Sequence, residues 1–125
     1  MVDKLRSPIA GLRVATITMF AVVSFACGAS SAPEIPMGSN GESDSELATG
    51  RNIWIQNCSS CHGSSGQGGR GKKLNEGEIL KLYPEIDGLI NVITVGKGQS
   101  MPAFVSQLSP VEIEAVSRYI REILN

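Results

Sequence analysis

The sequence predicts an all-α domain over residues 44–125, and three observations support this prediction. Helix-start signals stand at "SDSE" (43–46) and "SPVE" (109–112). Apolar residues near both signals recur at three- and four-residue spacing, which places them on one face of a helix. The single β-branched run, "GLINVITV", has no second run with which it would pair as a strand. We therefore expect about four helices joined by loops.

The first predicted helix begins at a capping box, with Ser43 as the N-cap and Glu46 as the third helical residue. It runs through "LATGRNIWIQNCSSC", in which Leu47, Gly50 and Trp54 share one face.

Two shorter helices are expected next. One starts at Asn75, which is followed three residues later by Glu78, and ends at Pro84. The other runs from Pro84 to Val95 and is closed by Gly96.

The last helix has the clearest signal. Ser109 is its predicted N-cap, Pro110 its first residue and Glu112 its third. Apolar residues then follow at helical spacing: Val111 or Ile113, then Val116, Ile120 and Leu124. The glycine-rich loops at 63–71 and 96–100 lack the spacing of phosphate-binding loops.

The first 26 residues have the pattern of a secretory signal. "MVDKLRSPIAGLR" is basic, and the uncharged run "VATITMFAVVSFA" (14–26) is long enough for a signal but shorter than the roughly 20 residues of a membrane span. We expect residues 1–26 to be a signal peptide or an uncleaved N-terminal anchor. A buried core helix fits the flanking residues poorly. The Ser-, Gly- and Pro-rich stretch 27–43 is typical of a flexible tether.

Cys27 stands where the apolar run ends, after "SFA" and before Gly28. This resembles a bacterial lipoprotein cleavage site, in which the cysteine that follows the cut is lipidated. Ser24 departs from the aliphatic residue usual there. A free thiol inside a discarded signal or a retained anchor is the alternative reading.

Composition limits the function classes. The net charge of −1 gives no indication of nucleic-acid binding. The whole chain has six aromatic residues, two of them in the export segment, so a small domain must fill its core with something other than its own side chains.

The stretch "NCSSCHG" (57–63) has four possible meanings. A zinc site lacks a second ligand pair. A redox dithiol belongs at a helix N-terminus, whereas this pair ends a helix. A disulfide is possible in an exported protein. None of these three gives His62 a role.

Covalent haem uses all three residues. Cys58 and Cys61 lie three apart on a helical turn, which allows thioethers to one porphyrin edge, and His62 follows as an iron ligand. The chain has no second histidine. Of its four methionines, Met101 in "GKGQSMPAF" is the only one outside the N-terminal segments, so we expect it to be the second axial ligand.

The folded part resembles a class I c-type cytochrome of the small bacterial monohaem kind. The resemblance rests on "CSSCHG", on "MPAF" and on the final "LSPVEIEAVSRYIREIL". It implies one haem c, and first and last helices that cross where Gly50 and Trp54 meet Tyr119. The family often has a proline carbonyl that accepts a hydrogen bond from the proximal histidine. No proline lies between His62 and Pro84, so we expect a carbonyl between residues 71 and 73 to replace it.

The resemblance implies an electron carrier cycling between Fe(III) and Fe(II), without a small-molecule substrate. It would shuttle electrons between membrane-associated redox complexes outside the cytoplasm, in the periplasm or on the outer face of the membrane, held there by an N-terminal lipid or anchor. Lys72, Lys73 and Lys97 are candidates for the haem rim. The alternatives are a haem enzyme or gas- or peroxide-responsive protein with a labile Met101, and a dedicated haem subunit of an oxidase or dehydrogenase.

Overall fold

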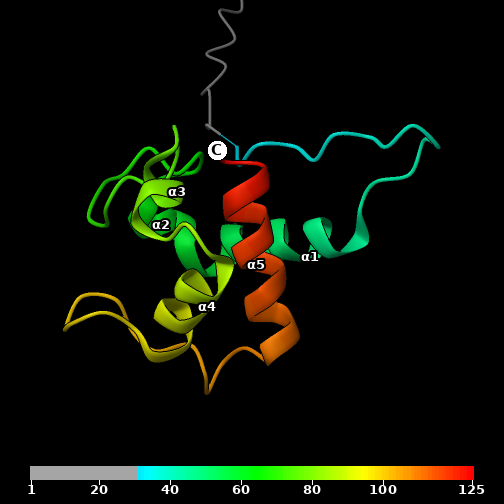
Figure 1. Cartoon of the computed structure of the whole chain (residues 1–125). Coiled ribbons are helices and arrows are strands. Elements are labelled where there is room, and N and C mark those ends of the chain that lie inside the picture. The colour runs from blue at the N-terminus through cyan, green and yellow to red at the C-terminus, as the bar shows by residue number, and fades with distance from the viewer. Residues whose placement is uncertain (1–30) are drawn as a thin grey trace, which may run out of the picture.

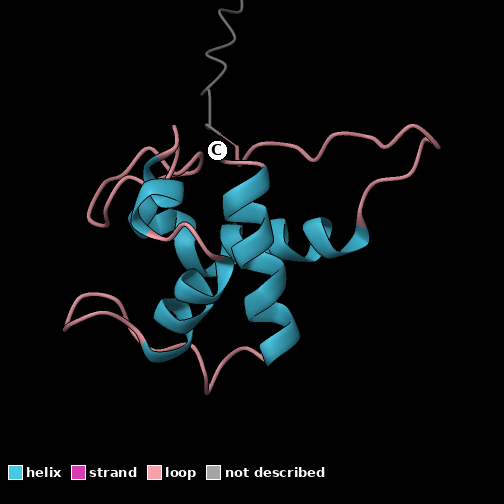
Figure 2. Ribbon diagram, viewed as in Figure 1, coloured by secondary structure: helices cyan, strands magenta, loops and turns pink. Residues whose placement is uncertain are grey.

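The computed structural model describes residues 31–125, and these form four helical stretches joined by loops (Figures 1 and 2). The first stretch is continuous from residue 45 to residue 62 and consists of α1 (Ser45–Ile53), the π-helical turn η1 (Trp54–Cys58) and α2 (Ser59–His62). It is followed by α3 (Glu78–Leu82), α4 (Ile86–Val95) and α5 (Pro110–Glu122). Residues 31–125 contain no strand beyond an isolated bridge between Lys97 and Met101, so the all-α prediction is confirmed for this part of the chain.

The helix starts differ from the predicted ones in three places. Asp44, not Ser43, caps α1, because its carboxylate accepts hydrogen bonds from the backbone N–H groups of Glu46 and Leu47. The N-cap of α3 is Gly77, in a left-handed conformation. The prediction of a start at Asn75 is wrong because the Asn75 amide donates to the Ser65 carbonyl.

The start predicted for α4 at Pro84 is also wrong, whereas its end and the start of α5 are confirmed. Glu85 is the N-cap of α4, and Gly96 closes the helix with a φ of 78°. At α5, the Ser109 side chain accepts from the Glu112 N–H while the Glu112 carboxylate accepts from the Ser109 N–H. This is the complete capping box that the sequence predicts.

Helix α5 crosses α1, and this is the most extensive contact between helices in residues 31–125 (Figure 1). Gly50 makes the close approach possible, because a Cβ added there would lie 2.7 Å from the Ala115 carbonyl carbon. Trp54 and Tyr119 are fully buried beside it, with ring centroids 6.4 Å apart. The predicted crossing through Gly50, Trp54 and Tyr119 is therefore confirmed.

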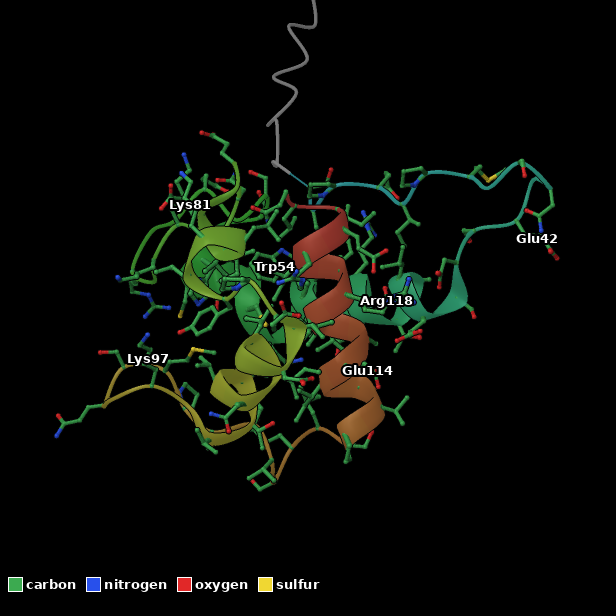
Figure 3. All side chains as sticks on the ribbon, in the orientation of Figure 1. Glu42, Trp54, Lys81, Lys97, Glu114 and Arg118 are labelled. Carbon is green, nitrogen blue, oxygen red and sulfur yellow. The ribbon has the colours of Figure 1, made fainter. Side chains whose placement is uncertain are left out.

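An ion cluster lies beside this crossing. Arg118 of α5 contacts the carboxylates of Asp44 (3.1 Å), Glu46 (2.6 Å) and Glu122 (2.8 Å) (Figure 3). Two of these partners belong to the start of α1 and one to α5. The cluster links the start of α1 to α5, although its exposed carboxylates limit what it adds to stability.

Residues 32–35, which we call the N-terminal arm, are packed on the folded unit. Ala32 is buried, and the Pro33 carbonyl accepts hydrogen bonds from the Tyr119 hydroxyl (2.7 Å) and from Arg51 Nε (2.9 Å). Arg51 also pairs with Glu34. Part of the stretch 27–43, which the sequence predicts to be a flexible tether, is therefore packed on the helices. Residues 1–30, including the predicted signal and Cys27, lie outside the described residues.

Candidate haem site

The helical stretch 45–62 carries the Cys-x-x-Cys-His motif at its end, as the sequence predicts. The helix widens into η1, which ends at Cys58, the first residue of the motif, and here the Ser59 N–H donates to the Trp54 carbonyl five residues earlier. The Asn57 side chain donates to the Ile53 carbonyl (3.1 Å) and supports this turn. Such π turns often occur at functional sites. No residue pattern in this segment distinguishes a π turn from a regular helix, and the sequence reasoning did not include it.

The imidazole of His62 is held by the loop that follows it. His62 Nδ1 lies 2.7 Å from the Lys72 carbonyl oxygen, and because a carbonyl only accepts, Nδ1 is the protonated nitrogen. This confirms the expectation that a carbonyl between residues 71 and 73 replaces the family's proline carbonyl. Nε2 is then the nitrogen with a free lone pair, as a metal ligand requires.

The glycines of this loop allow it to lie against the His62 ring. Gly71 donates its N–H to the Cys61 carbonyl (2.8 Å), and Gly68 donates to the His62 carbonyl (2.7 Å). A Cβ on Gly71 would lie 2.7 Å from His62 Cε1. The loop therefore fixes both the backbone and the ring of His62.

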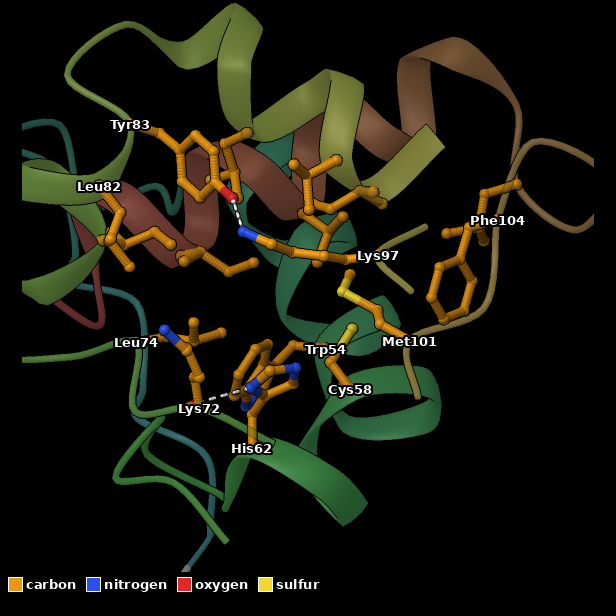
Figure 4. A pocket seen from close by; sticks show the side chains of 17 residues that line it. Trp54, Cys58, His62, Lys72, Leu74, Leu82, Tyr83, Lys97, Met101 and Phe104 are labelled. Carbon is orange, nitrogen blue, oxygen red and sulfur yellow. Dashed lines mark hydrogen bonds between the residues drawn. The ribbon is translucent and has the colours of Figure 1, made fainter. Parts of the chain in front are cut away.

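Met101 is positioned by the turn after α4. The Lys97 N–H donates to the Met101 carbonyl (3.0 Å), and the Phe104 N–H donates to the Ile93 carbonyl (3.1 Å). These bonds tie residues 97–104 back onto α4. Figure 4 shows the Met101 thioether directed to the same space as Cys58.

This space is an apolar cavity of about 760 Å³, including the part open to solvent. Cys58, His62 and Met101 all line it (Figure 4). Its other walls are mainly aliphatic side chains of α3, α4 and α5, such as Ile79, Leu89 and Val116. Cys61 lines an adjoining hollow together with the same three residues. The structure thus brings four of the predicted site residues together, whereas Cys27 lies outside the described part.

Within residues 31–125, neither cysteine of the motif forms a disulfide. Burial raises the pKa of the Cys58 thiol to about 12, and the neighbouring Cys61 acts in the same direction. Cys58 is thus neutral at physiological pH, unlike a redox-active cysteine, whose thiol pKa is lowered.

These residues fit a covalently bound haem. One thiol, an imidazole and a thioether line the apolar cavity, and the second thiol lines the adjoining hollow; together they are the donor set of a c-type haem with His and Met ligands. The cavity also answers the composition problem, because a porphyrin would supply the apolar volume that so few large side chains leave unfilled.

Of the three predicted rim lysines, Lys72 and Lys97 line the cavity. Lys73 instead pairs with Glu76 at 2.6 Å. Tyr83 also lines the cavity, and its hydroxyl accepts a hydrogen bond from Lys97 Nζ (2.9 Å). The sequence reasoning missed Tyr83, whose only sequence signal is an aromatic residue directly before Pro84.

Comparison with known proteins supports the haem assignment. A family model described as "Cytochrome C oxidase, cbb3-type, subunit III" matches residues 45–120. The chain is 34% identical over 73 residues to cytochrome c6 of Microcystis aeruginosa, covering 57% of this chain and 89% of that protein. It is 35% identical over 78 residues to the cbb3-type cytochrome c oxidase subunit FixP of Azorhizobium caulinodans, covering 59% of this chain but only 26% of that subunit.

A solved structure agrees with these relatives. Cytochrome c6 of the diatom Phaeodactylum tricornutum superposes with a TM-score of 0.51 at 30% identity, covering 59% of this chain and 88% of that one. The chain belongs to the cytochrome c family that the matched model describes, and its cofactor is haem c.

Proposed function

We propose that the haem is attached through Cys58 and Cys61 and that His62 and Met101 are the two axial ligands of its iron. The observation that carries this proposal is that the motif of one helix and a methionine about forty residues later line one apolar cavity and the hollow that adjoins it. When bound, the haem supplies a one-electron Fe(III)/Fe(II) couple. The residues of the chain hold it, exclude water from most of its surface and favour the ferrous form through a soft thioether ligand.

The experiment is expression together with a cytochrome c maturation system. We expect a red protein that keeps its haem through denaturing electrophoresis, and replacing Cys58 and Cys61 together by alanine should abolish this. Haem retention by the double variant would contradict the attachment.

The methionine ligand has a matched control within the chain. Met37 lies in the extended segment before α1 and is 71% exposed. Met101→Leu should remove the methionine–iron(III) charge-transfer band, whereas Met37→Leu should leave it unchanged. Retention of the band in Met101→Leu would exclude Met101 as the ligand.

Two axial ligands leave no open iron position for a substrate, so the proposed activity is outer-sphere electron transfer between redox complexes. A haem enzyme or gas sensor would need Met101 to dissociate under native conditions, and ready carbon monoxide binding by the reduced protein would indicate that. The chain spans about a quarter of the length of the FixP subunits that it resembles. A free electron carrier and a dedicated oxidase subunit are thus two different proposals. Co-purification of oxidase components after mild detergent extraction would favour the dedicated subunit.

We further propose export, with residues 1–26 as the signal and Cys27 as the site of lipid attachment. The support is the sequence pattern described above. No helix within residues 31–125 has the length and apolar character needed to cross a membrane. Intact mass of the membrane-extracted protein tests the cleavage site, the acyl chains and the haem together. A mass that retains residues 1–26 without acyl chains would indicate an uncleaved anchor.

A further inference from the structure

The loop that brings the Lys72 carbonyl to His62 has a sequence that does not fix its own shape. Five of the nine residues from 63 to 71 are glycines, and no proline lies between His62 and Pro84. Glycine leaves the backbone more freedom than any other residue, whereas proline restricts it. Contacts from outside this glycine-rich segment therefore have to hold the Lys72 carbonyl oxygen at 2.7 Å from His62 Nδ1 (Figure 4).

The first limb of the loop (63–68) lies against the second limb (71–75). The Gly66 carbonyl accepts hydrogen bonds from the backbone N–H groups of Leu74 (2.8 Å) and Asn75 (3.2 Å). The carbonyl that accepts from the histidine comes only two residues before this contact. Its position therefore depends on where the first limb is held.

Two side chains hold the first limb through consecutive carbonyls. The indole N–H of Trp54, whose side chain is fully buried, donates to the Ser64 carbonyl (2.8 Å). The side-chain amide of Asn75 donates to the Ser65 carbonyl (3.0 Å). The first bond ties the limb to the helical stretch 45–62, and the second ties it to the other limb. The two bonds together fix the turn that directly follows the haem-attachment motif.

The surroundings of Asn75 show which part of its side chain is used. Its amide oxygen Oδ1 is buried, and no group within residues 31–125 donates to it. A buried acceptor without a partner costs free energy, so the favourable contribution of this side chain is its N–H donor. Asn75 lines neither the haem cavity nor the adjoining hollow. It therefore acts on the haem site through the loop and not by direct contact.

Trp54 lies close to the ring that the loop orients. The centroids of the Trp54 and His62 rings are 6.2 Å apart. One side chain thus packs near the imidazole and also holds the loop that accepts its Nδ1 proton.

We propose that Trp54 and Asn75 are positioning residues for His62. In a loop that contains no proline, they hold the backbone so that the Lys72 carbonyl accepts the His62 Nδ1–H. This inference rests on the proposed haem binding. A hydrogen bond from the second nitrogen of a metal-bound imidazole makes that ligand more basic, and a more basic ligand stabilises ferric iron. A loop that is held less firmly should therefore raise the reduction potential.

The test compares two properties of haem-loaded variants: the reduction potential, and the hydrogen exchange of the His62 Nδ1 proton, followed by NMR in the reduced protein. Asn75→Ala should raise the equilibrium constant for reduction about threefold, which is about 28 mV for a one-electron couple. It should speed the exchange about fivefold, as expected for the loss of one hydrogen bond. Trp54→Phe keeps an aromatic ring without the N–H donor and should shift both properties in the same directions.

Tyr119→Phe is the matched control. It removes a hydrogen bond of the same kind, from a buried aromatic side chain to the Pro33 carbonyl (2.7 Å), and Tyr119 lines neither space. Both properties should stay within about 1.5-fold of the parent protein, because exchange through local opening of the loop does not depend on global stability.

Two outcomes would overturn the inference. One is an equilibrium constant or an exchange rate in Asn75→Ala that matches the parent protein. The other is equal acceleration of exchange in Asn75→Ala and Tyr119→Phe, because global unfolding would then explain both. Asn75→Ala decides alone if Trp54→Phe fails to accumulate. Absence of covalent haem from the parent protein would instead contradict the proposed function.

Discussion

Replacing Gly50 by alanine tests whether the close approach of α1 and α5 holds the fold together. The added methyl group would overlap the Ala115 carbonyl and lie 2.9 Å from Tyr119 Cβ. Both neighbours belong to α5, and neither is the end of a flexible side chain. The overlap can be relieved only if one helix moves away from the other.

The expected cost follows from two opposing effects. Overpacking of a core costs about 1–3 kcal/mol, and a clash with backbone belongs at the upper end of that range. Alanine in place of glycine inside a helix contributes about 1 kcal/mol in the opposite direction. The net loss of unfolding free energy is thus about 2 kcal/mol, which lowers the melting temperature of a domain of this size by about 8–16 °C.

Urea denaturation of the haem-loaded protein, followed by the fluorescence of the single tryptophan Trp54, measures this loss. Asn52→Ala is the control, because Asn52 lies on the exposed side of α1 and reports helix propensity without packing. It should leave stability unchanged or raise it slightly. If Gly50→Ala stays within about 0.5 kcal/mol of the parent protein, the argument from close helix packing is wrong.

Three further predictions concern the loop, a helix cap and a buried phenol. Gly71→Ala should displace the His62 ring and change the reduction potential, and an unchanged potential and visible spectrum would contradict the role given to this glycine. The backbone hydrogen bond from Leu47 is the largest cause that lowers the pKa of Asp44. The stability that the Asp44 carboxylate contributes is present above the unfolded pKa of about 3.9 and is lost as pH falls through the lower folded pKa. In Asp44→Asn, the unfolding free energy, measured by urea denaturation, should therefore fall less steeply as the pH is lowered. Burial raises the pKa of Tyr119 to about 12. The stability that the neutral Tyr119 hydroxyl contributes is therefore complete below about pH 10 and is lost as pH rises toward 12. Ultraviolet titration of the parent protein and of Tyr119→Phe would detect this.

The sequence predicted most of the helices because their signals are local. The capping box of Ser109 and Glu112 depends only on residues three apart, and it is complete in the structure. The start of α1 was misplaced by one residue because Ser43 and Asp44 are both good N-caps. Asp44 has the further advantage of an ion pair with Arg118, a residue 74 positions away that no local pattern includes.

The residues of the candidate site likewise include some that a local sequence pattern predicts and others that come together only in the tertiary structure. Cys58, Cys61 and His62 lie within five residues, so their spacing alone indicated haem attachment. Tyr83 and Lys97 come together only through the packing of α4 and through Arg121, so their pairing depends on the tertiary structure. The arm was missed for a related reason, because its composition is typical of a linker while its contacts come from Arg51 and Tyr119.

The docking of the arm determines how far the protein could move if it is attached to a membrane at Cys27. Five peptide steps separate residues 27 and 32, which span at most about 17–18 Å. A tether free up to residue 44 would instead reach about 56–61 Å. With so short a tether, the folded part of the protein would stay in a thin layer next to the lipid headgroups. Its electron donor and acceptor would then need to present their docking sites at that height, and a soluble partner further from the membrane would be out of range.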